Sequence, residues 1–297
     1  MFARLIPLAA MMLAGCASVD TEARSVAQDR QAFLDTCEDW DEWEKPAPPF
    51  RIYGNSYYVG TCGIAAILIT GEDGHVLIDG GSRGGGPLVE ASIRQLGYRI
   101  EDVKTLLHSH EHFDHVGGLA YLQRKSGAQL VASHGAAKAL ESGEVQPDDP
   151  QYGMEGGFEP ITVARKVRSF EAVSLGKIAL LPLTTPGHTS GALSWSWWSC
   201  EKTDCKVLVY ADSLSPVSSE TYRYGDHPEY IESYRAGLKA LADLPCDIVI
   251  TPHPSASQML ARMQDEDGLV DKAGCRSYAS GVEARLAKRL SDEVGAE

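Results

Sequence analysis

The stretch Ser109-His110-Glu111-His112-Phe113-Asp114-His115 concentrates groups that can bind metal ions. It directly follows Val103-Lys104-Thr105-Leu106-Leu107-His108, a short and mostly apolar run that predicts a buried strand. Side chains placed directly after such a strand lie at its carboxyl end, where loops can converge on an ion. In an extended segment, His110 and His112 point the same way and can bind one metal ion. Asp114 and His115 lie beyond the turn, so we expect them to face a second ion.

Two further histidines occupy similar positions. His188 lies in the glycine-rich turn Thr185-Pro186-Gly187-His188-Thr189-Ser190-Gly191, and His253 follows the predicted strand 247–251. A single histidine at a strand end is usually a loop residue, but the histidine-rich stretch favours a ligand role for both. Imidazole nitrogen and carboxylate oxygen are natural ligands of zinc, and hydrolytic sites keep one position open for water. The pattern therefore predicts two Zn²⁺ ions in a hydrolase.

The pattern His110-x-His112-x-Asp114-His115, with His188 and His253 downstream, resembles the signature of the metallo-β-lactamase superfamily. This resemblance implies a ligand set for each ion. The first zinc ion would bind His110, His112 and His188, and the second would bind Asp114, His115 and His253.

Similarity to the all-histidine lactamases of subclass B3 extends over roughly residues 37–285. Cys37 and Cys62 look most like those of the AIM-type members. The other segments that look like B3 enzymes are Tyr53-Gly54-Asn55, Tyr58-Val59-Gly60-Thr61, Leu77-Ile78-Asp79-Gly80, Ser194-Trp195-Ser196-Trp197, Tyr210-Ala211-Asp212-Ser213-Leu214 and Thr251-Pro252-His253-Pro254-Ser255-Ala256-Ser257.

The resemblance implies an enzyme that opens the β-lactam ring of penicillins, cephalosporins and carbapenems and so gives antibiotic resistance. A hydroxide held between the two zinc ions would attack the ring carbonyl. Asp114 is the implied catalytic residue, because it would hold the water that protonates the departing nitrogen. Ser213 and Ser215 would bind the substrate carboxylate. We expect Gln151, in the long polar loop 142–159, to be a further substrate contact.

Two alternatives share this pattern. Exported lactonases and thiolester hydrolases of the glyoxalase II kind bridge their metal ions with an aspartate, and Asp212 is the residue that could do so. Ser213 and the run Asp-Ser-Leu-Ser instead favour the B3 interpretation, and the cysteine ligand of B1 lactamases is missing here. The other alternative is a zinc-binding module without catalysis.

Strands and helices alternate in two similar halves, without a linker between them. This pattern predicts an α/β protein with two sheets packed face to face and helices outside, an αββα four-layer sandwich in one domain, residues 46–297. The main predicted strands are 51–58, 63–70, 75–79, 103–107, 129–133, 178–184, 193–198, 206–210 and 247–251, and the predicted helices are 87–96, 117–126 and 228–244, followed by terminal helices.

The beginning of the chain predicts export. Residues 1–15 contain one arginine and a short apolar run, as in a signal peptide, and end at a lipobox-like Leu13-Ala14-Gly15-Cys16. We expect Cys16 to be lipidated, with residues 16–45 as a tether and an extended N-terminal arm; cleavage further on is the alternative. The protein would be a monomeric periplasmic lipoprotein of a Gram-negative bacterium.

The net charge of -14 argues against nucleic acid as a partner.

Export also permits disulfides among the six remaining cysteines. Counting alone allows 15 ways of pairing them. Cys200 and Cys205 flank a polar tip between two predicted strands, which makes them the easiest pair. We expect the bonds Cys37 with Cys62, Cys200 with Cys205, and Cys246 with Cys275.

The other histidines carry weaker signals. His75, His134 and His227 occur singly near turns, and we expect no role for them. His108 should point away from the site if the strand alternates, so we interpret it as structural. Asp79, at the end of an apolar strand, is expected to orient a ligand histidine from behind.

Overall fold

The computed structural model describes residues 26–154, 156–265 and 268–295. The predicted signal peptide, the predicted lipidation site Cys16 and residues 16–25 of the predicted tether lie outside this part of the chain. The first described element is helix α1 (Val26–Thr36), where the polar composition had led us to expect an extended arm. Phe33 explains the difference, because its fully buried ring packs against Phe50 and Tyr58.

Seven strands form the first sheet in chain order. Strands β1 to β4 pair antiparallel, and β4 to β7 pair parallel. Their bounds are β1 (Phe50–Tyr53), β2 (Ser56–Tyr58), β3 (Ile67–Ile69), β4 (His75–Ile78), β5 (Val103–Leu107), β6 (Gln129–Ser133) and β7 (Val163–Val167).

The second sheet has five strands in the order β12-β11-β10-β9-β8. β8 to β11 pair antiparallel, and β12 joins β11 in parallel. The bounds are β8 (Val173–Leu175), β9 (Ile178–Thr184), β10 (Leu193–Glu201), β11 (Asp204–Tyr210) and β12 (Ile248–Ile250).

Alternating apolar side chains make the two sheets face each other. In β3, Ile67 and Ile69 belong to the core between the sheets, whereas Leu68 belongs to the core beneath the outer helices. β12 repeats this pattern, with Ile248 and Ile250 in the core between the sheets. Because successive residues of a strand point to opposite faces, a strand with apolar residues throughout is buried on both sides.

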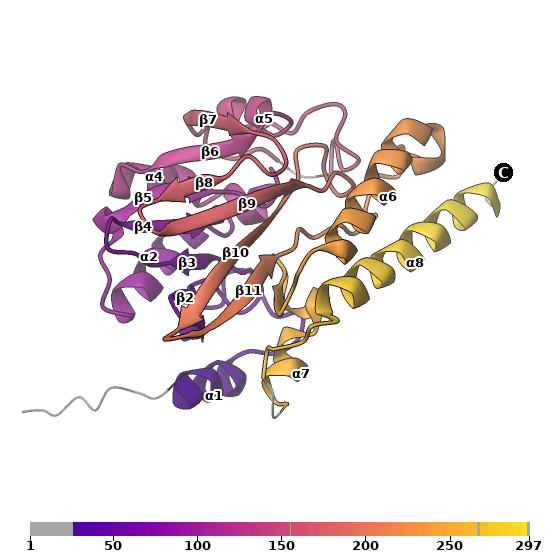
Figure 1. Ribbon diagram of the computed structural model, residues 1–297. Helices are drawn as coiled ribbons and strands as arrows, with labels where there is room; N and C mark the ends of the chain where they lie inside the picture. Colours follow the sequence, from indigo (N-terminus) through magenta and orange to yellow (C-terminus); the bar gives the residue numbers. More distant parts are fainter. Residues whose placement is uncertain (1–25, 155, 266–267, 296–297) are drawn as a thin grey trace, which may run out of the picture.

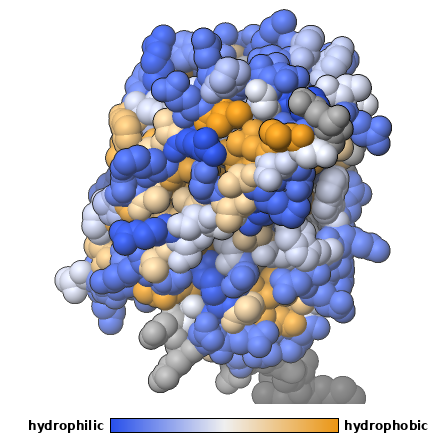
Figure 2. All heavy atoms as spheres, turned by 90° about the vertical axis from the view of Figure 1, so that its right-hand side faces the viewer, coloured by the Kyte–Doolittle hydropathy of each residue, from blue (hydrophilic) through white to orange (hydrophobic). Residues whose placement is uncertain are grey.

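Helices cover the outer face of each sheet (Figure 1). α2 (Gly85–Gln95), α4 (Leu119–Ser126) and α5 (Ala137–Ser142) pack on the seven-stranded sheet, and α6 (Pro228–Asp243) and α8 (Gly274–Gly295) pack on the five-stranded sheet. The chain is therefore the predicted αββα sandwich. None of the described helices is long and apolar enough to cross a membrane. The face that carries α6 and α8 is mostly hydrophilic, with separate apolar patches (Figure 2).

The elements differ from the prediction mainly at turns. Residues 51–58 form the hairpin β1–β2 instead of one strand, because Gly54 adopts a positive φ of 52° between them. The polar loop is as expected: the described residues between α5 and β7 contain no helix or strand. α5, β7 and two short elements, α3 (Phe113–Val116) and α7 (Met259–Met263), had no clear periodic signal.

Candidate metal centre

Asp79 fixes the start of the histidine-rich stretch. Its carboxylate accepts hydrogen bonds from the Ser109 amide (2.7 Å), the Ser109 hydroxyl (2.7 Å) and the Tyr210 hydroxyl (2.9 Å). The carboxylate also lies 3.9 Å from His115 Nδ1. Asp79 therefore supports the stretch from behind through Ser109, whereas its distance to His115 is too long for a hydrogen bond, so the orienting of a ligand histidine by Asp79 stays a prediction.

A change of backbone conformation divides the stretch in two. His112 is extended (φ -85°, ψ 151°) and is directly followed by the short helix α3. His110 and His112 precede the helix, and Asp114 and His115 lie inside it. This change separates the two pairs of side chains, as the spacing predicts.

The first cluster contains His110, His112 and His188, whose ring nitrogens lie within 4.8 Å of one another. Each ring has one nitrogen held from outside. The contacts are His110 Nδ1 with Asp212 Oδ1 (2.7 Å), His112 Nε2 with Asp149 Oδ2 (2.9 Å) and His188 Nδ1 with the Ser215 carbonyl oxygen (2.9 Å).

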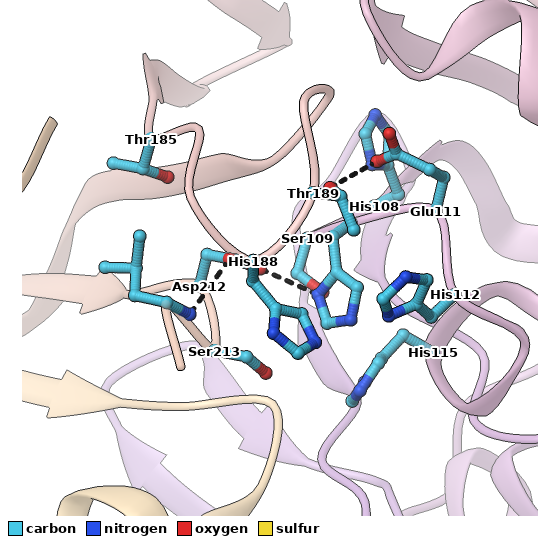
Figure 3. Close-up of polar contacts among 12 residues, drawn as sticks. His108, Ser109, Glu111, His112, His115, Thr185, His188, Thr189, Asp212 and Ser213 are labelled. Carbon is cyan, nitrogen blue, oxygen red and sulfur yellow. Dashed lines mark hydrogen bonds and ion pairs between the residues drawn. The ribbon is translucent and has the colours of Figure 1, made fainter. Parts of the chain in front are cut away.

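The opposite ring nitrogens are the atoms that an ion in the first cluster would bind. His110 Nε2 is buried and has no hydrogen-bond partner in the described part of the chain. The rings of His112, His115 and His188 face a common space (Figure 3). This donor set fits a zinc ion, because a ligand histidine commonly donates its other ring N–H to a carboxylate or carbonyl.

The second cluster contains Asp114, His115 and His253. Asp114 Oδ2 lies 2.9 Å from His115 Nε2 and 3.4 Å from His253 Nε2. The ring of His115 is 4.3 Å from that of His110, so the two clusters adjoin. The structure thus brings all six predicted ligands together, with imidazole and carboxylate donors that suit zinc.

Charge and burial also favour cations here. Burial, reinforced by His115 and His188, lowers the pKa of His110 well below its usual value, and burial lowers the pKa of His188 to about 3. Burial alone would lower the pKa of His112, but the hydrogen bond to Asp149 raises it overall. Neutral imidazole is the form that binds a metal ion, so the rings of His110 and His188 are in the form that can bind one.

The carboxylates give the same indication. Burial would raise the pKa of Asp114, but the nearby His115 holds it well below its ordinary range. Burial raises the pKa of Asp79 and Glu111 to about 7 and that of Asp212 to about 8. No lysine or arginine is among the buried residues of the described chain. Bound cations would favour the ionised form of these buried carboxylates.

The His188 loop is held from two sides. Gly187 leaves room for the ring of Tyr234, which would lie 2.4 Å from a Cβ at this position. Glu111 accepts hydrogen bonds from the Thr189 hydroxyl (2.8 Å) and the Gly191 amide (3.0 Å), the first of which is drawn in Figure 3. Glu111 thereby ties the His188 loop to the histidine-rich stretch.

A cleft of about 600 Å³ opens over the two clusters. Gln151, Ser213 and Ser215, the predicted substrate contacts, all line it. Gln151 Nε2 lies 3.2 Å from His188 Nε2, and the buried Ser213 hydroxyl has no hydrogen-bond partner in the described chain. Asp212 does not line the cleft, because its carboxylate is turned to His110.

The remaining sequence predictions can be placed as well. His108 lies outside both clusters, and its Nε2 accepts a hydrogen bond from the Ser133 amide. His75, His134 and His227 also lie outside both clusters. Disulfides join the three expected pairs, Cys37–Cys62, Cys200–Cys205 and Cys246–Cys275.

Sequence reasoning missed several residues of the site. Asp149 lies in the polar loop, and no motif in the neighbouring sequence indicated a role for it. Its carboxylate nevertheless forms a hydrogen bond with His112. Trp40 and Trp43 form an aromatic wall of the cleft, with ring centroids 6.3 and 6.0 Å from that of His253. Two tryptophans in an otherwise polar arm are unusual, and this composition is the feature of the sequence that could have indicated their role.

Comparison with known proteins places this geometry in a family. The family model of the metallo-β-lactamase superfamily matches residues 59–253 of this chain, so the chain belongs to that superfamily. Among solved structures, MIM-2 metallo-β-lactamase is 54% identical, with 89% of this chain and 98% of that chain covered and a TM-score of 0.86. MIM-1 from Novosphingobium pentaromativorans is 46% identical, with 90% and 99% covered and a TM-score of 0.87.

A third structure narrows the class. MEM-A1, a subclass B3 metallo-β-lactamase from a soil metagenome library, is 40% identical, with 86% of this chain and 100% of that chain covered and a TM-score of 0.83. Within the superfamily, the chain is a member of subclass B3. More distant is the hydroxyacylglutathione hydrolase of Rhodopseudomonas palustris (strain BisB5), 27% identical over 161 residues and 54% of this chain. The chain spans about half the length of the curated relatives it matches.

Proposed function

We propose that this chain hydrolyses the β-lactam ring of penicillins, cephalosporins and carbapenems with two zinc ions bound at the candidate metal centre. One observation carries the proposal. Ser213 lines the cleft with a hydroxyl that has no hydrogen-bond partner among the described residues, while the neighbouring Asp212 carboxylate is turned away from the cleft to His110 Nδ1, 2.7 Å distant. The likeness to B3 enzymes along nearly their full length supports it.

Two bound zinc ions would acidify a water molecule and polarise the lactam carbonyl. The protein contributes position and charge. The first cluster arrives with its rings already oriented, since Asp212, Asp149 and the Ser215 carbonyl hold their outer nitrogens. Asp114 is the only carboxylate among the described residues that line the cleft. It is therefore the group placed to hold the water that protonates the departing lactam nitrogen.

A thiolester hydrolase or lactonase of the same superfamily is the second candidate. The curated relatives named hydroxyacylglutathione hydrolase favour it. Such a site needs an aspartate that bridges the two metal ions. Asp212, which lies shortly after β11, is the residue in the matching position. Its hydrogen bond to His110 and its absence from the cleft lining argue against this use.

A substrate panel tests the proposal directly. Purified protein with two zinc ions should turn over a chromogenic cephalosporin, a penicillin and a carbapenem, followed by steady-state absorbance. A chelator should abolish turnover and added Zn²⁺ should restore it, because zinc is the electrophile that these ligands would hold. If the protein cleaves homoserine lactone or a glutathione thiolester and leaves all three lactams intact, the proposal is wrong and the second candidate holds.

We also propose that the chain is an exported lipoprotein. The lipobox-like sequence ending at Cys16 and the three disulfides support this, because disulfides persist in oxidising compartments. Fractionation of producing cells should find the protein in the membrane, and Cys16→Ala should move it to the soluble part of the envelope. A cytosolic wild-type protein would contradict the proposal.

A further inference from the structure

Arg285 brings a positive charge to the wall of the cleft. It belongs to α8, more than 30 residues beyond the last predicted zinc ligand, His253. Among the described residues that line the cleft, Arg285 is the only lysine or arginine, and Asp114 is the only carboxylate. Arginine keeps its charge at any physiological pH. The cleft thus has one permanent cationic side chain, at its α8 side.

No acidic side chain forms an ion pair with Arg285 in the described part of the chain. Two other cations of α8 have acidic partners one turn ahead: Lys288 with Asp292 (2.6 Å) and Arg289 with Glu293 (2.8 Å). Arg285 has glycine at i−4 and arginine at i+4. No ion pair or hydrogen bond of its guanidinium is found in the described part of the chain.

The geometry of α8 connects Arg285 to the segment that carries Ser213. Tyr278, seven residues earlier, lies on the same face of the helix, because seven residues make almost two turns. Its hydroxyl donates to the carbonyl oxygens of Asp212 (3.0 Å) and Ser213 (2.5 Å). Between them, Gly281 has no side chain, and a Cβ there would stand 3.6 Å from an Arg285 guanidinium nitrogen. The helix that holds the serine segment therefore also presents the arginine.

The donors on this wall share one chemistry. Ser213 is 4% exposed, its buried hydroxyl has no partner in the described chain, and it lines the cleft together with Ser215 and Arg285. Hydroxyls and a guanidinium suit an anion, and a planar guanidinium matches a carboxylate with two parallel hydrogen bonds. Penicillins, cephalosporins and carbapenems each carry a carboxylate on the ring fused to the lactam.

We propose that Arg285 binds the ring carboxylate of β-lactam substrates, together with Ser213 and Ser215, and thereby selects anionic lactams over neutral ones. This inference rests on the proposed function. It assigns the substrate anion to the α8 side of the cleft.

The test compares a chromogenic cephalosporin with its neutral methyl ester on enzyme with two zinc ions. For the acid, Arg285→Gln should raise KM by about 10-fold and change kcat little, because the charge pairs with the substrate before and during the reaction. For the ester, Arg285→Gln should match the wild type. Arg285→Lys should recover most of the lost affinity for the acid. Added salt should raise KM of the wild type for the acid more than that of Arg285→Gln.

Lys288→Gln is the matched control. It removes one positive charge from the same helix, but Lys288 is exposed and does not line the cleft. Its kinetics should equal those of the wild type with both substrates. If Arg285→Gln leaves KM for the acid unchanged, or loses acid and ester equally, the role of Arg285 is refuted while the β-lactamase activity stands. If the wild type hydrolyses neither substrate, the proposed function fails and this inference fails with it.

Discussion

The two halves of the metal centre are built differently. In the first cluster, every histidine has an outer nitrogen held at 2.7 to 2.9 Å by Asp212, Asp149 or the Ser215 carbonyl. In the second cluster, His253 has a side chain that is 19% exposed, and its outer surroundings are the rings of Trp40 and Trp43. His115 reaches Asp79 only at 3.9 Å.

This difference indicates how each half would bind its ion. A hydrogen bond to the outer nitrogen fixes both the tautomer and the direction of a histidine ring. The first cluster is therefore oriented before an ion arrives, whereas the second depends on the packing of the N-terminal arm. We expect the first zinc ion to bind more tightly than the second.

Asp114→Asn should have the largest effect on this comparison. The amide keeps the size of the side chain but loses the negative charge that faces His115 and His253. The second zinc ion should be lost, and kcat/KM should fall by about 100-fold or more, since a proton acceptor is lost as well. Metal analysis should find one zinc ion per chain. Two retained ions and a rate near that of the wild type would contradict the division into two clusters.

Asp149→Asn should weaken the first cluster by a smaller amount. His112 would lose its charged partner at 2.9 Å, and loss of such an outer partner typically reduces metal affinity by about 10- to 100-fold. Competition with a chromophoric chelator measures this affinity. The adjacent Asp148→Asn is the control, because Asp148 is exposed and its carboxylate accepts a long hydrogen bond from the Ser190 hydroxyl, at 3.4 Å. Equal losses in both variants would show that the loop, and not the contact, matters.

The parts of this centre that follow from local pattern were predictable from the sequence. The spacing of His110, His112, Asp114 and His115 determines which side chains diverge at a strand end, and the alternation of predicted strands and helices in two halves predicted both sheets. Contacts between distant segments were not predictable in this way. Asp149 and His112 are 37 residues apart, and Asp212 and His110 are 102 apart.

Those long-range contacts depend on how the elements pack. From the sequence alone, Asp212 could have bridged the two metal ions. Only the folded position of the segment after β11 shows that its carboxylate contacts His110 instead. Arg285 had a weak local signal, the lack of an acidic residue one turn away on α8, but nothing local placed it at the cleft. Loop residues such as Asp149 and Gln151 carry no periodicity that could indicate their direction.

Trp43→Ala should have the smallest effect, confined to the second cluster. Trp43 packs against Phe113 and His253, with ring centroids 5.7 and 6.0 Å apart, and its carbonyl oxygen accepts a hydrogen bond from the Thr61 hydroxyl. An aromatic contact of this kind contributes about 0.5 to 1.5 kcal/mol, so the second zinc ion should bind about 2- to 10-fold more weakly and the first unchanged.

The control for this variant is Trp198→Ala, which removes a tryptophan that is 67% exposed on β10 and does not line the cleft. Titration of zinc into metal-free protein separates the two binding steps in both variants. An unchanged second step in Trp43→Ala would mean that His253 is oriented without the arm. A weakening of both steps would mean that the arm stabilises the whole centre, and the contrast between a hydrogen-bonded half and a packed half would then be wrong.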